Sequence, residues 1–238
     1  NDGKMIGSSE ISFTRTADTS LSKSRLSFDS QHRMILDGKR FFPIGHYTGR
    51  MTDEDMEQFK RGPYNFAVQY GRMNVEHLNR WQKAGVYVAA DVRSLIYGYN
   101  HSARCRFKTE DESKAELKKM VDSIGSHPAL IMWYLNDEAP VSFVPNVMMA
   151  HNYLRSIDPD RATLTCLSNP ETSRNFLPTF DVFAHDCYPI GNRVGRSMLE
   201  RVNSQMRISK KSIASMRPLW FIPQAFDWRW YYSKEVWA

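Results

Sequence analysis

The stretch His127-Pro-Ala-Leu-Ile-Met-Trp-Tyr-Leu-Asn-Asp-Glu-Ala-Pro140 decides the fold of this chain. Residues 129 to 135 form an unbroken apolar run of strand length, which stops at Asn136, Asp137 and Glu138. Unbroken apolar runs are typical of parallel strands that are buried on both faces. In barrels of alternating strands and helices, functional groups lie at the carboxyl ends of such strands. The stretch therefore predicts a buried parallel strand that delivers three polar side chains to a site, although a solvated loop with a helix cap is the plainer alternative.

Units of strand and helix repeat on both sides of this stretch. Further strands are expected over residues 41–45, 64–70, 86–92, 162–167, 180–189 and 218–226. Helices are expected between them, from residues 52–61, 74–85 and 109–124, from residue 145 onward and near 195–214, on the basis of capping residues and apolar spacing. Strands joined through helices imply right-handed crossovers and a parallel sheet. The predicted fold class is α/β, a (β/α)8 TIM-type barrel.

Two parts of the chain depart from a complete barrel. Only seven barrel strands can be assigned, and residues 228–237 are too short to supply both a helix and an eighth strand. We therefore expect the eighth βα unit to come from a companion chain or from a continuation of the polypeptide. Residues 1–32 are rich in Ser, Thr and charge, and we interpret them as a leader or the tail of an upstream β-domain. The barrel is expected to occupy residues 33–238, beginning with a hairpin that turns at Asp37-Gly38.

Composition narrows the classes of function. The chain has 238 residues, of which 42% are hydrophobic, enough for one large core. Its net charge of +6 comes from scattered residues, so nucleic-acid binding is not expected. No apolar run reaches the roughly 18 to 20 residues of a membrane span. The 3 cysteines show no disulfide framework or zinc spacing, and no cofactor or metal is expected. The sequence Asn100-His101-Ser102 is a glycosylation sequon, which matters only in a secreted protein.

Two motifs resemble one family. The pattern His-Pro-x-Leu-Ile-x-Trp-x-Leu-x-x-Glu over residues 127–138 resembles the fourth-strand motif of clan A glycoside hydrolases, the retaining (β/α)8 enzymes that include β-galactosidases and β-glucuronidases. Residues 33–46 resemble the entry of the same enzymes into their first barrel strand. The resemblance extends over roughly residues 33 to 230 and implies that Glu138 is the general acid/base, although Asp137 stands where the family has an Asn. It also implies a secreted or extracellular protein whose partner is carbohydrate, a polysaccharide or glycan.

The second carboxylate of the reaction is not assigned by the sequence. Retaining hydrolysis uses two carboxyl groups about 5 to 5.5 Å apart. The resemblance implies a nucleophilic Glu at the end of the seventh strand, where this chain has Gln224. Three alternatives stay open. Asp186 acts at the wider separation of about 6.5 to 9.5 Å that suits an inverting mechanism; Asp137 shares the work with Glu138, although neighbours on a strand face apart; or the barrel is a pseudoenzyme that binds sugar without cleaving it.

Strand ends also supply candidate substrate-binding residues. Aromatic rings can stack on sugars and polar groups can bond to hydroxyls, although ordinary packing is the alternative for each residue taken alone. The candidates are Tyr47, Trp133, Tyr188 and Trp220 for stacking, and His46, Arg93, Asn136, His185 and Gln224 for polar contacts. We expect Glu138 and Asp186 to open into one pocket with Trp133, Tyr188 or Trp220 nearby. The sequence does not specify the sugar, the linkage or the stereochemical outcome.

Overall fold

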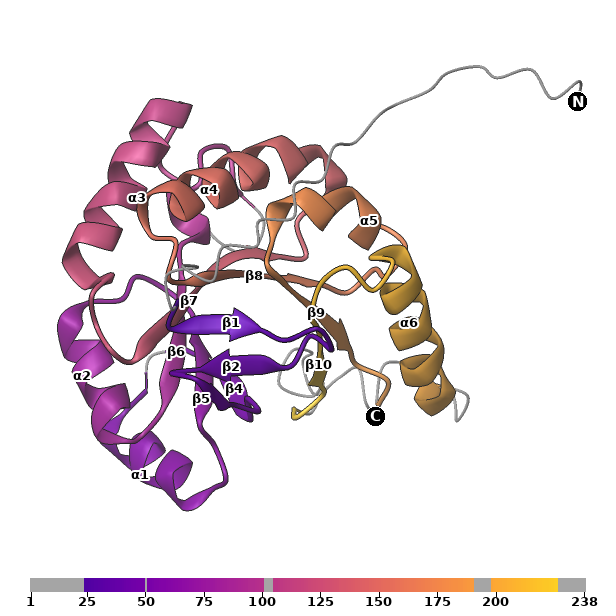
Figure 1. The fold of residues 1–238 in the computed structure, drawn as a ribbon, viewed down its shortest axis with the longest axis horizontal. Coiled ribbons are helices and arrows are strands. Elements are labelled where there is room, and N and C mark those ends of the chain that lie inside the picture. The colour runs from indigo at the N-terminus through magenta and orange to yellow at the C-terminus, as the bar shows by residue number, and fades with distance from the viewer. Residues whose placement is uncertain (1–23, 50, 101–104, 191–197, 227–238) are drawn as a thin grey trace, which may run out of the picture.

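The centre of the molecule is a curled parallel sheet of seven strands (Figure 1). The computed structural model describes residues 24–49, 51–100, 105–190 and 198–226. Within them the order of strands in this sheet is β10-β9-β8-β7-β6-β5-β4. The bounds are Gly45–Thr48 for β4, Phe66–Gln69 for β5, Tyr87–Asp91 for β6, Leu130–Asp137 for β7, Ala162–Leu167 for β8, Val182–Cys187 for β9 and Leu219–Pro223 for β10. The predicted α/β class and the parallel sheet are confirmed, and the curled sheet is consistent with part of a TIM-type barrel.

Helices cover the outer face of this sheet (Figure 1). They are α1 (Asp53–Arg61), α2 (Val75–Lys83), α3 (Glu110–Ile124), α4 (Val144–Ile157), α5 (Ser173–Phe176) and α6 (Met198–Ser212), with short 3-10 turns η1 (Arg93–Leu95), η2 (Val141–Phe143) and η3 (Leu177–Thr179). Thr52 and Thr109 form the capping boxes that start α1 and α3, and Asn74 caps α2, as the sequence predicts. The short α5, between β8 and β9, was not predicted because four residues carry no helical periodicity.

The alternation of side chains along β7 divides the core into two layers. Met132 and Tyr134 pack in the inner layer enclosed by the sheet, whereas Trp133 and Leu135 pack in the outer layer against the helices. All four side chains are fully buried. This explains the unbroken apolar run, because a strand covered on both faces has no solvent-facing position.

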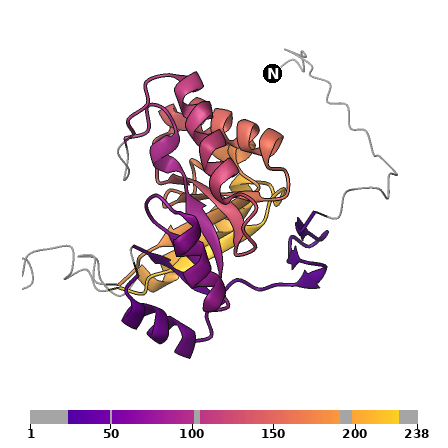
Figure 2. The ribbon, with the colours of Figure 1, turned by 90° about the vertical axis from the view of Figure 1, so that its left-hand side faces the viewer.

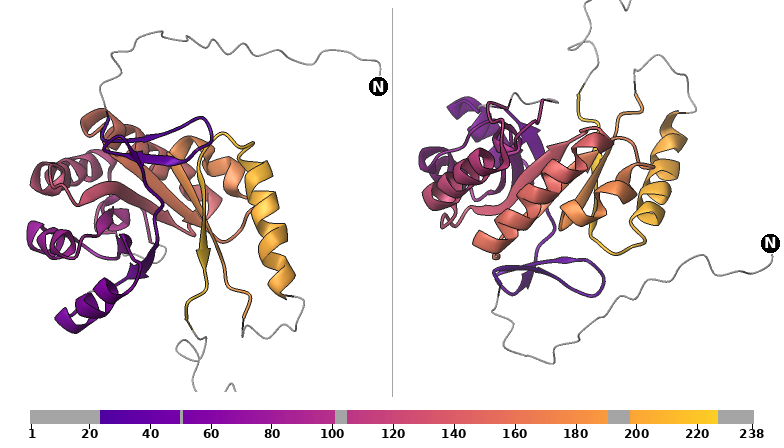
Figure 3. Two further views of the ribbon diagram at one scale, coloured as in Figure 1. Left: turned by 60° about the horizontal axis from the view of Figure 1, so that its bottom comes forward. Right: turned by 90° about the horizontal axis from the view of Figure 1, so that it is seen from above.

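A small antiparallel sheet closes one end of the larger sheet (Figures 2 and 3). It consists of β1 (Leu26–Phe28), β2 (Met34–Leu36) and β3 (Lys39–Arg40). Leu26, Met34 and Leu36 pack in the inner layer. Arg25 donates a hydrogen bond to the Pro128 carbonyl just before β7, so the small sheet lies at the amino-terminal ends of the barrel strands.

The hairpin turn at Asp37-Gly38 is present, with positive φ at both residues (50° and 74°) as a two-residue turn of this type requires. Because β1 pairs with β2 in the register Leu26↔Leu36, residues 26–28 form one small sheet with residues 34–36, which lie on the other side of the expected boundary at 33. Residues 1–23 and 227–238 lie outside the described residues. Their assignment to a leader and to an incomplete eighth unit therefore stays a prediction.

Candidate functional site

Glu138 and Asp186 meet at the carboxyl ends of their strands. Glu138 directly follows β7, and Asp186 lies in β9 with a side chain that is 3% exposed. Burial is the largest cause that raises the pKa of Asp186, and the charge and hydrogen-bond contact of the neighbouring Glu138 carboxyl add to it; together they bring the pKa to about 7. The Tyr188 hydroxyl donates to Asp186 Oδ2 at 2.9 Å. Two carboxyls and a phenol therefore share one corner of the sheet.

A β-bulge brings Asp137 to the same side. In the pairing of β7 with β8, Tyr134 aligns with Leu164 but Asn136 aligns with Thr165, so Leu135 is an extra residue. The alternation shifts by one, and Asp137 aligns with Cys166 of the inner layer. Burial raises the pKa of the Cys166 thiol, and the charges of Asp186, Asp137 and Glu138 raise it further, which places all three carboxyls around one thiol.

The backbone of Glu138 turns this residue to the same region as Asp137. Its φ is +55°, in the left-handed region that non-glycine residues rarely adopt, and its N–H donates to the Cys166 carbonyl at 2.9 Å. The expectation that neighbours on an extended strand face apart fails here, because the backbone is no longer extended at Glu138. Asp137 and Glu138 therefore both contribute to the cluster.

Arg93 is held between two carboxylates at the rim of the sheet. Its side chain is 3% exposed and forms ion pairs with Asp91 and Asp137. Its guanidinium lies 4.6 Å from the ring centroid of Tyr70 and 5.0 Å from that of Tyr134. Burial disfavours the charged form, but hydrogen bonds and the charge of Asp91 outweigh it and raise the pKa of Arg93. Arg93 therefore orients Asp137 at the site, as a fixed cation.

Three of the predicted binding residues face the helices instead of the site. His46 packs on Phe59 of α1 with ring centroids 5.7 Å apart, and Trp133 donates from Nε1 to Asp158 Oδ2 at 2.9 Å. His185 is fully buried, and its Nδ1 lies 3.0 Å from the Leu167 carbonyl oxygen. Their placement at the site was wrong because each lies one residue away from an inward-facing position, and strand side chains alternate.

Two other candidates support the site from inside the sheet. Tyr47 lies in the inner layer, with its ring centroid 5.4 Å from that of Tyr134. Trp220 packs on Phe66, with centroids 5.5 Å apart, and aligns with Ala184 two residues before Asp186. Trp220 therefore lies a layer below the carboxyls, whereas Tyr188 is the predicted aromatic residue that contacts Asp186.

Gln224 bonds to the protein's own backbone, and Asn136 bonds to the backbone and to the Tyr99 hydroxyl. Gln224 Oε1 accepts from the Ile190 N–H at 2.9 Å, and its Nε2 donates to the carbonyls of Ile190 at 2.9 Å and Phe226 at 3.0 Å. It thereby ties the segment after β9 to the segment after β10. Asn136 is fully buried, and its Oδ1 accepts from Tyr99 and from the Ala139 N–H, each at 3.2 Å.

Sequence reasoning missed several residues that shape the site. Asp91 was visible as a polar residue at the end of a buried strand, a signal equal to that of Asp186. Cys166 and Tyr134 carried no such signal, because an apolar run hides which of its members face inward. Tyr99 lies in a connecting loop, and only the fold brings it to β7.

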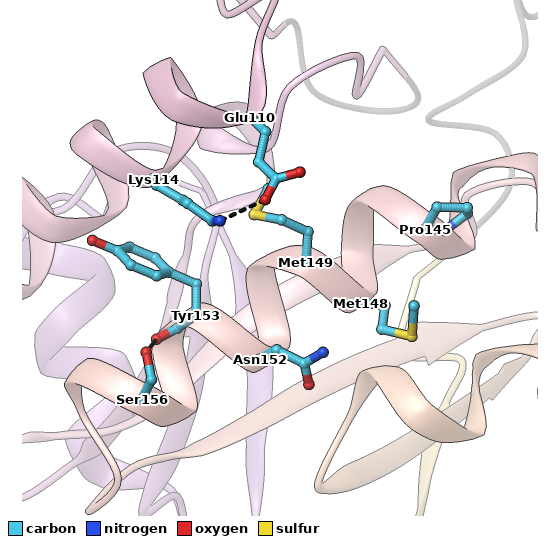
Figure 4. A pocket seen from close by; sticks show the side chains of 8 residues that line it. All are labelled: Glu110, Lys114, Pro145, Met148, Met149, Asn152, Tyr153 and Ser156. Atoms are coloured by element: carbon cyan, nitrogen blue, oxygen red, sulfur yellow. Dashed lines mark hydrogen bonds and ion pairs between the residues drawn. The ribbon is translucent and has the colours of Figure 1, made fainter.

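A second feature of the surface lies away from the carboxyls. A hollow of about 490 Å³ between α3 and α4 is lined by eight residues (Figure 4): Glu110, Lys114, Pro145, Met148, Met149, Asn152, Tyr153 and Ser156. Lys114 and Glu110 form an ion pair across one helical turn, 2.5 Å between Nζ and Oε1. The hollow belongs to the outer helix layer. Across the residues that the structure describes, no group of three or more His, Cys, Asp or Glu side chains is arranged to hold a metal ion, and no helix is long and apolar enough to cross a membrane.

Comparison with known proteins relates the fold to one class of enzyme. No protein-family description and no curated protein sequence matches the chain. Among solved structures, the β-D-glucuronidase of Dictyoglomus thermophilum is 16% identical with a TM-score of 0.65, over 82% of this chain and 38% of that one. The GH2 β-galacturonidase of Eisenbergiella tayi is 14% identical with a TM-score of 0.61, over 82% of this chain and 37% of that one. A GH2 member from Bacteroides cellulosilyticus is 20% identical with a TM-score of 0.57, over 85% of this chain and 30% of that one.

At these identities the likeness shows the fold. The curled sheet and its helices resemble part of glycoside hydrolase family 2 enzymes, which agrees at the level of fold with the resemblance found in the sequence. The chain spans a little over a third of the length of the first two enzymes.

Proposed function

We propose that this chain forms the barrel portion of a glycoside hydrolase-like protein that acts on a polysaccharide or glycan, with Glu138 as general acid/base. One observation carries the proposal: Glu138 ends the fourth strand of the parallel sheet beside Asp186, whose pKa is raised to about 7. A catalytic acid works best when its pKa lies near the working pH. The pair holds a proton under those conditions.

In this proposal Asp186 and Glu138 have different roles: one holds the proton and the other delivers it. Asp186 is almost fully buried, whereas Glu138 is only partly covered and can be reached by a glycosidic oxygen. In this proposal Asp186 keeps a proton near Glu138, and Glu138 passes it to the leaving group. The close contact does not favour Asp186 as an inverting base, because such a base stands about 6.5 to 9.5 Å from the acid to admit a water.

Asp137 remains the candidate for the second carboxylate. It reaches the cluster through the bulge and is ion-paired with Arg93. Gln224 favours the competing proposal, a non-catalytic carbohydrate-binding barrel, because its amide cannot act as a nucleophile and is engaged with Ile190 and Phe226.

Hydrolysis by the full chain tests the proposal. The protein is incubated with aryl β-D-glucuronides and β-D-galacturonides, which match two enzymes of similar fold, and with aryl β-D-galactosides, because the motif over residues 127–138 resembles that of β-galactosidases. Glu138→Gln is expected to lower turnover of substrates with poor leaving groups about 10²- to 10⁴-fold. Glu110→Gln, in the outer hollow, is the matched control and should leave turnover unchanged. Equal turnover by Glu138→Gln and the parent would remove Glu138 from the mechanism.

Binding measurements separate the two proposals. If calorimetry shows saturable sugar binding that Glu138→Gln changes, while no product forms, the non-catalytic barrel is favoured. If Asp137→Asn abolishes hydrolysis but keeps binding, Asp137 is the second carboxylate. A chain that neither binds nor cleaves any glycan tested would contradict both proposals.

Completion of the sheet and secretion are further parts of the proposal. Within the described residues, β4 pairs only with β5 and β10 only with β9, so each keeps one open edge. A companion chain or a continuation of the polypeptide that supplies another βα unit would cover these edges. Intact-mass measurement with sequencing of any co-purified chain tests this. A glycan on Asn100, detected by peptide mass, would support an extracellular location.

A further inference from the structure

The end of β7 has an unusual backbone that needs support. A bulge at Leu135 and a positive φ at Glu138 follow each other within four residues. A left-handed conformation is unfavourable for residues other than glycine and persists where surrounding contacts impose it. The contacts around β7 therefore indicate what imposes it here.

The phenol of Tyr99 makes three of these contacts. Its oxygen accepts from the Asp137 N–H at 3.0 Å and lies 3.3 Å from the Asp137 carbonyl oxygen. It also lies 3.2 Å from Asn136 Oδ1, which in turn accepts from the Ala139 N–H. One hydroxyl thus bonds to the backbone and side chain of the two residues between the bulge and Glu138.

The segment that carries Tyr99 is itself fixed to the outer helices. Ser113 of α3 donates to the Leu95 carbonyl at 2.6 Å, and Asn146 of α4 donates to the Tyr97 carbonyl at 2.9 Å. The Tyr99 ring is fully buried and packs on Phe143, with centroids 5.8 Å apart. The hydroxyl is therefore held in place by the helix layer rather than by β7.

We infer that Tyr99 is a positioning residue, whose hydroxyl holds the bulged end of β7 so that Asp137 and Glu138 both face Asp186. The consequence for hydrolysis rests on the proposed function, but the consequence for geometry does not. The plainer alternative is that Tyr99 only fills space between β7 and Phe143. A phenylalanine would serve that purpose equally well, so the two interpretations predict different results for Tyr99→Phe.

Titration of Asp186 reports the geometry without any substrate. In the parent, carbon-13 NMR of the side-chain carboxyl should show an Asp186 pKa near 7, and Glu138→Gln should lower it by removing the adjacent like charge. Tyr99→Phe should also lower the pKa of Asp186, because Glu138 moves away from it. Tyr153→Phe removes the same atom from a tyrosine in the outer hollow (Figure 4) and should leave the titration unchanged.

Asn136→Ala provides a second route to the same result if Tyr99→Phe does not fold. It removes the acceptor that joins Tyr99 to Ala139, and the Asp186 pKa should fall again. If Tyr99→Phe folds and its Asp186 titrates as in the parent, the inference is overturned. If only Asn136→Ala folds, the same result in that variant overturns it. It is also overturned if Glu138→Gln leaves the Asp186 titration unchanged, because the pair would then not exist in solution.

Hydrolysis separates this inference from the proposed function. If the parent is active, Tyr99→Phe should lower kcat about 10²-fold, the effect of misplacing a reacting group by about 1 Å. If the parent neither binds nor cleaves glycans but the titration shifts as expected, the positioning role stands and the proposed function fails.

Discussion

The two ends of the curled sheet differ in the kind of side chains that they contain. At the amino-terminal end, β1 to β3 lay apolar side chains such as Leu26, Met34 and Leu36 onto the inner layer, and the Asp-Gly turn has the geometry its sequence favours. At the carboxyl-terminal end, one buried and two partly buried carboxyls surround Cys166, and the backbone of Glu138 is left-handed.

The difference separates an end that stabilises the fold from the end that we propose to be the functional site. Apolar packing at the first end stabilises the fold without chemical consequence. An unfavourable backbone conformation, buried charge and two adjacent carboxyls at the second end each destabilise the folded state, and such features cluster at functional sites. Substitutions that had the same effects at both ends would contradict this distinction between the two ends.

The largest effect is expected from Arg93→Met. The substitution leaves Asp91 and Asp137 without their buried cation, and removal of one partner of a buried ion pair costs about 3 to 5 kcal/mol. Urea unfolding at pH 7 measures this loss. The double variant Asp91→Asn/Arg93→Met should recover part of it, and a single variant as stable as the parent would show that the cluster is not buried in solution.

Leu36→Ala is expected to act at the opposite end. Leu36 is 4% exposed and packs in the inner layer, so its truncation should cost about 2 to 3 kcal/mol, the lower half of the usual range because the small sheet lies at the edge of the core. Leu199→Ala, at a residue 64% exposed, is the control with little change. The Asp186 titration should not move in either variant; a shift would show that the two ends are coupled.

The stability of the parent should fall with rising pH because of Asp186. Its folded-state pKa is raised from 3.8 to about 7, so its contribution to stability is complete below pH 3.8 and is lost as pH rises through about 7. The slope should reach about 1.4 kcal/mol per pH unit within that window. Asp186→Asn should flatten the stability profile between pH 4 and 7, as measured by urea unfolding at several pH values. An unchanged slope would assign the pH dependence to other groups.

The smallest effect is expected from Glu138→Gly. Glycine adopts a φ of +55° without steric cost, so the variant should be about 1 kcal/mol more stable than the parent while losing the proposed acid. Thermal unfolding measures the gain. Glu138→Ala removes the same carboxyl but keeps the backbone cost, and it should show less gain than the glycine variant.

Much of the fold was predictable because its signals are local. The capping boxes at Thr52 and Thr109, the hairpin turn at Asp37 and the seven strands each follow from a few adjacent residues. The position of Glu138 at the end of a buried strand could likewise be predicted from adjacent residues. Its meeting with Asp186 follows from the parallel sheet, since the carboxyl ends of parallel strands lie at one edge.

The direction of individual side chains was less predictable, because it depends on counting by twos along a strand. A one-residue error sends a side chain to the other face, which is why His46, Trp133 and His185 were misplaced. The bulge at Leu135 shifts the alternation of side chains within β7, and no residue in the apolar run indicates its presence.

The sequence by itself determined the alternation of strands and helices, the capped helix starts and the buried strand that ends in Asn136, Asp137 and Glu138. Only the tertiary structure decided that Asp137 joins Glu138 and Asp186. Tyr99, 38 residues away from Asp137, bonds to the end of β7, and Gln224, 34 residues from Ile190, bonds to the loop after β9. The physical reason is that apolar periodicity depends only on residues that are neighbours in the sequence. A hydrogen bond between distant segments forms only after packing of the core has brought those segments together.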